Sequence, residues 1–251
     1  LFVSAFGLIN YLYQSKKYIA AIDTQNMFSK MISFLLPSIF IVSLYFSFRL
    51  EIVSFWNQQF SDAVITINNG EEYPKKYWNY DLLRFRTVWI VNYTLLFVSL
   101  LSFVNIKKFK NQQLGLINLG LNTLAILIFL VQGLYSLSLL RDTYLTPSLS
   151  EYFNHGAINI WIRYVSFILI AITLFANYKY IKQEFIKSNL KLGFDFLLHI
   201  TVLWILSSEL INWMDMLAFS QSYKLVLSVL WGIYSLLLIS IGIWKNKQYL
   251  R

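Results

Sequence analysis

The chain of 251 residues contains no cysteine, which excludes disulfides, thiolate nucleophiles and cysteine-based metal sites. It has two histidines, so a metal centre with several histidine ligands is not expected. Charged residues make up only 13% of the chain, whereas a soluble domain has about 25%. No Walker sequence, dinucleotide fingerprint, HExxH motif or nucleophile elbow is present. We therefore expect no cofactor and lean against an enzyme.

Apolar residues are abundant and come in long blocks. The chain is 57% hydrophobic, and the block Leu114–Leu140 runs for 27 residues without a charge. A helix of about 20 apolar residues crosses the hydrocarbon of a bilayer. The net charge of +9 comes largely from lysines in short segments between such blocks, as in a membrane protein. The lipid bilayer is therefore the expected partner, and nucleic acid is not.

Seven apolar blocks predict membrane spans, and helices are the structure that satisfies every backbone group in lipid. The blocks are Phe2–Tyr13, Ile32–Leu50, Thr87–Ile106, Leu114–Leu140, Ile160–Tyr178, Phe194–Trp213 and Tyr223–Trp244. The first block is too short to cross, as if truncated. We predict an all-α, polytopic transmembrane helix bundle of about seven helices. Residues 1–251 would form a single transmembrane domain, a fragment of a longer chain.

The segments between the blocks alternate in charge. Lysines dominate the set at 14–31, 107–113, 179–193 and 245–251, whereas the other set holds most of the acidic residues. By the positive-inside rule the lysine-rich set is cytoplasmic. The amino end is then outside and the carboxyl end inside.

The longest connection, Glu51–Arg86, is predicted to be an extracytoplasmic loop. Val53, Trp56, Phe60 and Val64 recur in it at helical spacing, which suits a helix on the membrane surface. The aromatic and lysine residues of Tyr73–Tyr80 could bind a sugar or lipid head group, although a rim packed on the bundle is the simpler interpretation.

The sixth span carries polar residues on one side. At 100° per residue, Asp195, His199 and Glu209 fall within 80° of one another, with Asn212 beside them. A histidine between two carboxylates could relay protons or bind a cation. A structural alternative is favoured: the carboxylates reach headgroup water and His199 bonds a neighbouring helix.

Two further candidates lie on the fourth and fifth spans. Asn118 and Asn122 share a face with Gly115, Ala125, Gly133 and Ser136, which favours helix packing over a solute path. Arg163 lies near the outer end of its span, within reach of Glu151 or Glu209. A structural ion pair is the default there, and an anion or head-group contact the alternative.

The end of the chain resembles a known family. Ser208-Glu209-Leu210, Leu227–Tyr234 and Gly242–Lys245 are similar to the carboxyl-proximal part of the domain of unknown function 2339 family, large bacterial polytopic membrane proteins. The resemblance covers about 45 residues, implies a multi-pass protein of the bacterial cytoplasmic (inner) membrane with more helices than seven, and implies no established activity.

Three functions stay open. The first is a non-enzymatic, structural or transport-related part of the cell envelope, with the remaining helices of the full-length protein or an envelope assembly as partners. The second is an envelope glycosyl- or acyltransferase acting on lipid-linked substrates, with outer residues as candidates: Asp62, Glu71, Glu72, Asp81 and His155. The four acids lie in the loop 51–86, which contains lysines and is expected to be solvated. A seven-helix sensor rests on helix count alone.

Overall fold

The structure of the chain is a computed structural model that describes residues 27–67, 74–147, 152–153, 155–186, 190–219 and 222–245, with side chains from residue 38 onward. The first predicted span, Phe2–Tyr13, lies outside the described residues. The helices are α2 (Met27–Asp62), α3 (Asp81–Val104), α4 (Gln112–Ile128), α5 (Leu134–Leu145), α6 (Ile158–Ile181), α7 (Lys191–Met216) and α8 (Tyr223–Trp244). Two π-helical turns, η1 (Asn105–Phe109) and η2 (Phe129–Gly133), extend α3 and join α4 to α5.

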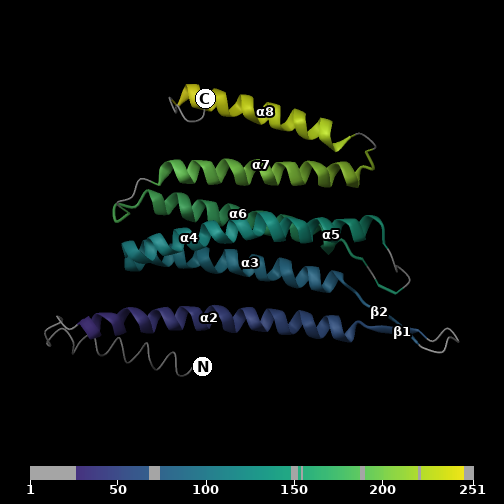
Figure 1. Cartoon of the computed structure of the whole chain (residues 1–251), viewed down its shortest axis with the longest axis horizontal. Coiled ribbons are helices and arrows are strands. Elements are labelled where there is room, and N and C mark those ends of the chain that lie inside the picture. Colours follow the sequence, from purple (N-terminus) through teal and green to yellow (C-terminus); the bar gives the residue numbers. More distant parts are fainter. Residues whose placement is uncertain are drawn as a thin grey trace. The chain divides into compact units, whose positions relative to one another are not determined.

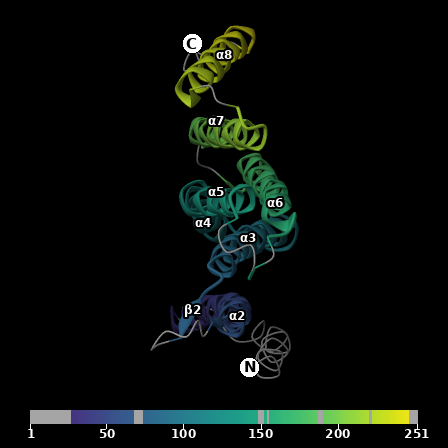
Figure 2. The same cartoon turned by 90° about the vertical axis from the view of Figure 1, so that its right-hand side faces the viewer.

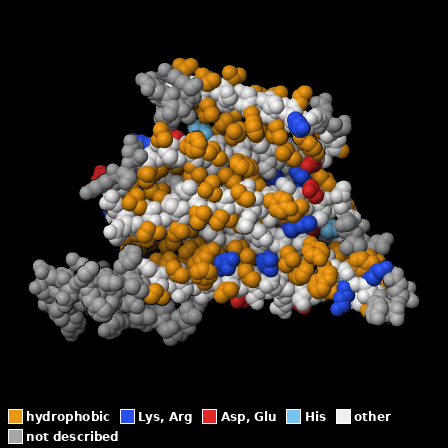
Figure 3. Space-filling model, in the orientation of Figure 1, with side chains coloured by type: hydrophobic (Ala, Val, Ile, Leu, Met, Phe, Trp, Pro, Cys, Tyr) orange, Lys and Arg blue, Asp and Glu red, His pale blue; other side chains and the backbone are white. Residues whose placement is uncertain are grey.

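These helices confirm the all-α bundle. Among the described residues, six helical segments are long and apolar enough to cross a membrane: 38–62, 81–109, 112–145, 158–181, 191–216 and 223–244. This is the architecture of a multi-pass membrane protein. Hydrophobic side chains cover much of the face shown in Figure 3, as expected for helices surrounded by lipid.

The packing divides the chain into two units, Leu1–Ser54 and Phe55–Arg251. The first contains most of α2. The second contains the last turns of α2, the remaining helices and a small antiparallel pair of strands, β1 (Ile65–Ile67) and β2 (Lys75–Tyr77), in which Ile65 pairs with Tyr77. The sequence did not predict these strands.

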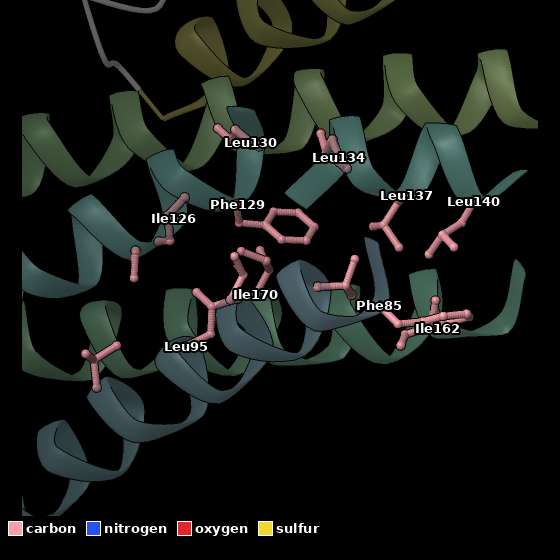
Figure 4. Packing of buried hydrophobic residues seen from close by; sticks show 14 residues of the cluster. Phe85, Leu95, Ile126, Phe129, Leu130, Leu134, Leu137, Leu140, Ile162 and Ile170 are labelled. Carbon is pink, nitrogen blue, oxygen red and sulfur yellow. The ribbon is translucent and has the colours of Figure 1, made fainter. Parts of the chain in front are cut away.

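Within the larger unit, three membrane-spanning segments form the core: α3 with η1, α4–η2–α5, and α6, all in mutual contact. α7 packs against α5, α6 and η2, and α8 packs against α7 (Figures 1 and 2). The buried cluster includes Phe129 of η2, Leu95 of α3 and Ile170 of α6 (Figure 4), and all three side chains are nearly inaccessible to solvent.

The end of α2 differs from the expectation. We predicted a span ending at Leu50 and a separate surface helix, but α2 continues to Asp62 because residues 51–62 contain no proline or glycine to end it. Trp56 does not mark a surface helix: its ring stacks on Phe85 of α3, with ring centroids 5.5 Å apart. Phe60 likewise stacks on Trp78. The predicted loop 51–86 therefore begins with helix, and Trp56 within it packs on α3.

Candidate functional site

One half of the three-segment core contains a network of neutral polar side chains. Asn122 donates to Asn177 Oδ1 at 2.6 Å and to Ser102 Oγ at 2.9 Å, which ties α4 to α6 and α3. Asn118 donates to the same Ser102 hydroxyl at 2.6 Å. The predicted face of the fourth span is buried in full, and these amides bond across helix interfaces. The geometry is that of interhelical packing.

Hydroxyls and a phenol extend this network towards both ends of α6. Ser99 and Thr173 share a hydrogen bond of 2.9 Å. Asn105 donates to Tyr180 Oη at 2.7 Å and to the carbonyl of Asn111. Most of these residues of α6 were not predicted to be buried together. Their sequence pattern, a polar residue every three, four or seven positions, indicates one polar face of the helix: Asn159, Arg163, Ser166, Thr173, Asn177 and Tyr180.

Charged groups gather at the other end of the core, where α6 meets α7. Arg163 is 1% exposed, and its Nη1 lies 3.3 Å from Glu209 Oε2. Glu209, one of the two partners that the sequence suggested, therefore pairs with Arg163, and the other, Glu151, lies outside the described residues. Tyr164 donates to Glu209 Oε1 at 3.0 Å, and Asn212 donates to the same oxygen at 3.4 Å. We call Arg163, Tyr164, Ser208, Glu209 and Asn212 the α6–α7 site.

The α6–α7 site contains unsatisfied polar atoms. Arg163 Nη2 and Asn212 Oδ1 are buried and have no hydrogen-bond partner among the described residues. Arg163 Nη1 also reaches the carbonyl and hydroxyl of Ser208, both at 3.3 Å, so none of its contacts is short. One donor and one acceptor are thus available around a loosely held ion pair, which is an arrangement that can take a polar ligand or water.

The predicted polar face of α7 does not form one cluster. His199 Nδ1 lies 3.0 Å from Tyr234 Oη of α8, whereas Glu209 bonds α6. Ten residues of helix separate the two along the axis by about 15 Å. Asp195 lies half-buried near the beginning of α7. The physical reason for the split is that α7 lies between the core helices α5 and α6 and the last helix α8, and uses different residues to contact each. The described residues include no cluster of metal ligands.

A second charged cluster surrounds Asp81, the first residue of α3. Arg84 Nη1 donates to Asp81 Oδ1 at 2.7 Å, and Asn159 Nδ2 donates to Oδ2 at 2.9 Å. Thr143 Oγ1 lies 3.0 Å from both carboxylate oxygens. His155 Nδ1 lies 3.0 Å from Oδ2, and its Nε2 is buried without a partner among the described residues.

This Asp81 cluster corrects one sequence interpretation. We placed Asp81 in a solvated loop, but it is 5% exposed and is joined to α5, α6 and His155. Glu71, Glu72 and Glu151, also named from the sequence, lie outside the described residues, and Asp62 is exposed at the end of α2.

A third charged group lies on α5 and α7. Arg141 Nη2 contacts Asp142 at 2.8 Å and Asp215 at 2.7 Å, and the guanidinium is close enough to Arg163 for the two to repel each other. Asp215 also accepts a short hydrogen bond from Tyr223 of α8. Ion pairs of this kind join α7 to the core at one end.

No family model, curated protein or solved structure matches the chain.

Proposed function

We propose that the chain is a non-enzymatic, transport-related component of a bacterial cytoplasmic membrane, in which the α6–α7 site receives a polar group from the outer side. The polar group would belong to a small solute or to the head of a lipid-linked precursor. The proposal rests on one observation: Arg163 is a charged side chain within a membrane-spanning segment, almost fully buried, with Nη2 unpartnered among the described residues.

Charge at membrane depth supports this interpretation over a purely structural one. Ionisable residues inside spans are costly and commonly mark the paths of ions or substrates. A structural ion pair would be expected to satisfy its hydrogen-bonding groups, but Arg163 and Asn212 each retain an atom with no partner in the described part of the chain.

The position of α7 also supports it. Only Thr201, Asn212 and Met214 of α7 are buried, whereas α3 and α6 bury residues along their whole length. Elements with few buried contacts open at the lowest cost in free energy. A small displacement of α7 would therefore expose the site without disturbing the core.

The wider assignments rest on the sequence. The alternating lysines support an outer location for the α6–α7 site, since Arg163 and Glu209 lie in the halves of their helices distant from the lysine-rich segments. The resemblance at Ser208–Leu210 and Leu227–Tyr234 supports membership of the domain of unknown function 2339 family and a bacterial location. Exposed apolar residues on α8, among them Leu225, Val229 and Leu236, suit contact with lipid or with further helices.

Adjacent serines on α7 provide a matched test. Ser208 faces Arg163, whereas the hydroxyl of Ser207 accepts a hydrogen bond from Trp231 of α8 at 2.9 Å. Because the native chain has no cysteine, Ser208→Cys and Ser207→Cys each introduce a single thiol at nearly equal depth. We expect a charged, membrane-impermeant thiol reagent added to intact cells to label Ser208→Cys faster, by at least tenfold. If neither cysteine is labelled, water does not reach the site, and a purely structural role for the bundle would replace the transport proposal.

The Asp81 cluster favours the enzyme alternative in one respect. A carboxylate that holds Nδ1–H of a histidine leaves Nε2 able to accept a proton, as in a general base. The alternative predicts that His155→Gln abolishes turnover of lipid-linked sugars in isolated membranes. The transport proposal predicts no such turnover by the wild-type chain.

A further inference from the structure

Asn92, in the middle of α3, is the most poorly satisfied polar side chain among the described residues. It is 1% exposed, and neither Nδ2 nor Oδ1 has a hydrogen-bond partner in the described part of the chain. Its neighbours along the buried face of α3 are Val88 and Leu95. A donor and an acceptor left unpaired in such surroundings indicate an ordered molecule that the protein itself does not supply.

The register of α3 on α6 places a second polar residue at this level. The helices run parallel: Asp81 bonds Asn159 near their beginning, and Ser99 bonds Thr173 further along. The offset in residue number is 78 for the first pair and 74 for the second, so Asn92 lies level with residues 166–170 of α6. Ser166, in this range, is fully buried. This part of the α3–α6 interface is therefore polar on both helices.

The register of α3 on the antiparallel segment α4–η2–α5 places η2 at the same level. Thr143 lies opposite Asp81 and Asn122 opposite Ser102, and the position opposite Asn92, between these pairs, falls in η2. α3 and η2 are in contact. A π turn accommodates one extra residue, interrupts the regular ladder of helix hydrogen bonds, and commonly marks a functional position.

The chemistry of the side chain selects the molecule. A cation would satisfy Oδ1 but would be repelled by the amide protons of Nδ2, and an anion would have the opposite conflict. Water both donates and accepts, and buried waters make about three hydrogen bonds to such groups. We propose that Asn92, facing η2, holds a buried water molecule in the middle of the three-segment core. The site lies along α3 between the Asp81 cluster and the neutral amide network.

Asn105 is the matched control for this site. It lies on the same helical segment and is fully buried, but Nδ2 donates to Tyr180 Oη and to the carbonyl of Asn111, and Oδ1 accepts from Asn111 N–H at 3.1 Å. Its amide needs no water.

The experiment is magnetisation transfer from water to asparagine side-chain amides, measured by NMR on the full chain with ¹⁵N-asparagine in lipid nanodiscs. The amide resonance of Asn92 is assigned as the one that disappears from the spectrum of Asn92→Leu. Asn92→Ser serves the same purpose if Asn92→Leu does not fold. We expect a water cross-peak at the Asn92 amide at least five times stronger than at the Asn105 amide. An assigned Asn92 signal without a water cross-peak, or with one no stronger than that of Asn105, would overturn the proposal.

Discussion

At the residue scale, the cost of burying charge decides how Arg163 and Glu209 respond to substitution. Arg163 is 1% exposed and Glu209 is 19% exposed at the side chain, so their pair is largely shielded from water. Removing one partner of a buried pair typically costs about 3–5 kcal/mol because the other charge stays buried. We expect Glu209→Gln to lower the free energy of unfolding by about 3 kcal/mol, towards the lower end of that range, because glutamine still accepts the bond from Tyr164. Denaturation in mixed micelles measures the change.

Asp142→Asn is the matched control for that measurement. Asp142 also pairs with an arginine, but its side chain is 53% exposed, and Arg141 keeps its second partner, Asp215, at 2.7 Å. Exposed pairs contribute about 1 kcal/mol or less. Losses of similar size in the two variants would contradict the burial argument and would mean that water already reaches Arg163.

The sequence predicted individual polar residues better than it predicted their partners. Glu209 was one of two partners suggested for Arg163, because both residues lie near the predicted outer ends of their spans. His199 and Glu209 share a face of α7 at 100° per residue. The periodicity of one helix does not show which neighbouring helix contacts each half of that face. Asp81 was predicted to lie in a solvated loop because its partners Thr143, Asn159 and His155 are distant in the sequence. Their contacts with Asp81 form only when the helices pack together.

At the element scale, the apolar blocks predicted the helices of the larger unit well, because a span must be long, apolar and fully hydrogen-bonded within itself. α8 begins and ends at the predicted residues, Tyr223 and Trp244. The end of α2 was missed because its last turns, beyond Leu50, pack through Trp56 against Phe85 of α3. The strands were missed because β1 forms only by pairing with β2. The turn η2 leaves no mark in the sequence other than Gly133.

Gly133 is required at η2 because of its close contact with Phe129. A Cβ added there would lie 2.6 Å from Phe129 Cδ2, and that ring is 1% exposed and confined by the core. Overpacking of this kind typically costs about 1–3 kcal/mol. Gly133→Ala should lower the unfolding free energy by that amount, measured by the same denaturation.

Gly120, on α4, tests the glycine effect without the contact. No atom lies within 4 Å of a Cβ added at Gly120, so alanine meets open space there. Since alanine favours helix over glycine by about 1 kcal/mol in soluble helices, Gly120→Ala should be neutral or stabilising. A Gly133→Ala variant as stable as Gly120→Ala would show that Phe129 can move aside and that η2 tolerates a larger residue.

At the scale of the whole molecule, the larger unit combines a compact core with two loosely attached helices. α3, α4–η2–α5 and α6 bury most of the core residues, whereas α8 buries only Tyr234 and Gly242 among its described residues. The charged clusters around Asp81, Arg141 and Arg163 lie at one end of this core, and Asn105 and Tyr180 at the other. The molecule is therefore polar in different ways at its two ends: ion pairs at one, neutral hydrogen bonds at the other.

The distribution of lysine at the helix ends assigns these two ends to the sides of the membrane. Five lysines lie in or next to the last turns of η1, α6 and α8, at the neutral end: Lys107, Lys108, Lys179, Lys182 and Lys245. These three helical segments end on the same side of the core (Figure 1). Positively charged ends are retained in the cytoplasm. The ion-pair end is then outside. Single cysteines at Ser61 and Thr146 should react with an impermeant thiol reagent in intact cells, and cysteines at Gln113 and Glu184 only after lysis. The reverse pattern would place the α6–α7 site on the cytoplasmic side, and a mixed pattern would mean that one of the described helices does not cross the membrane.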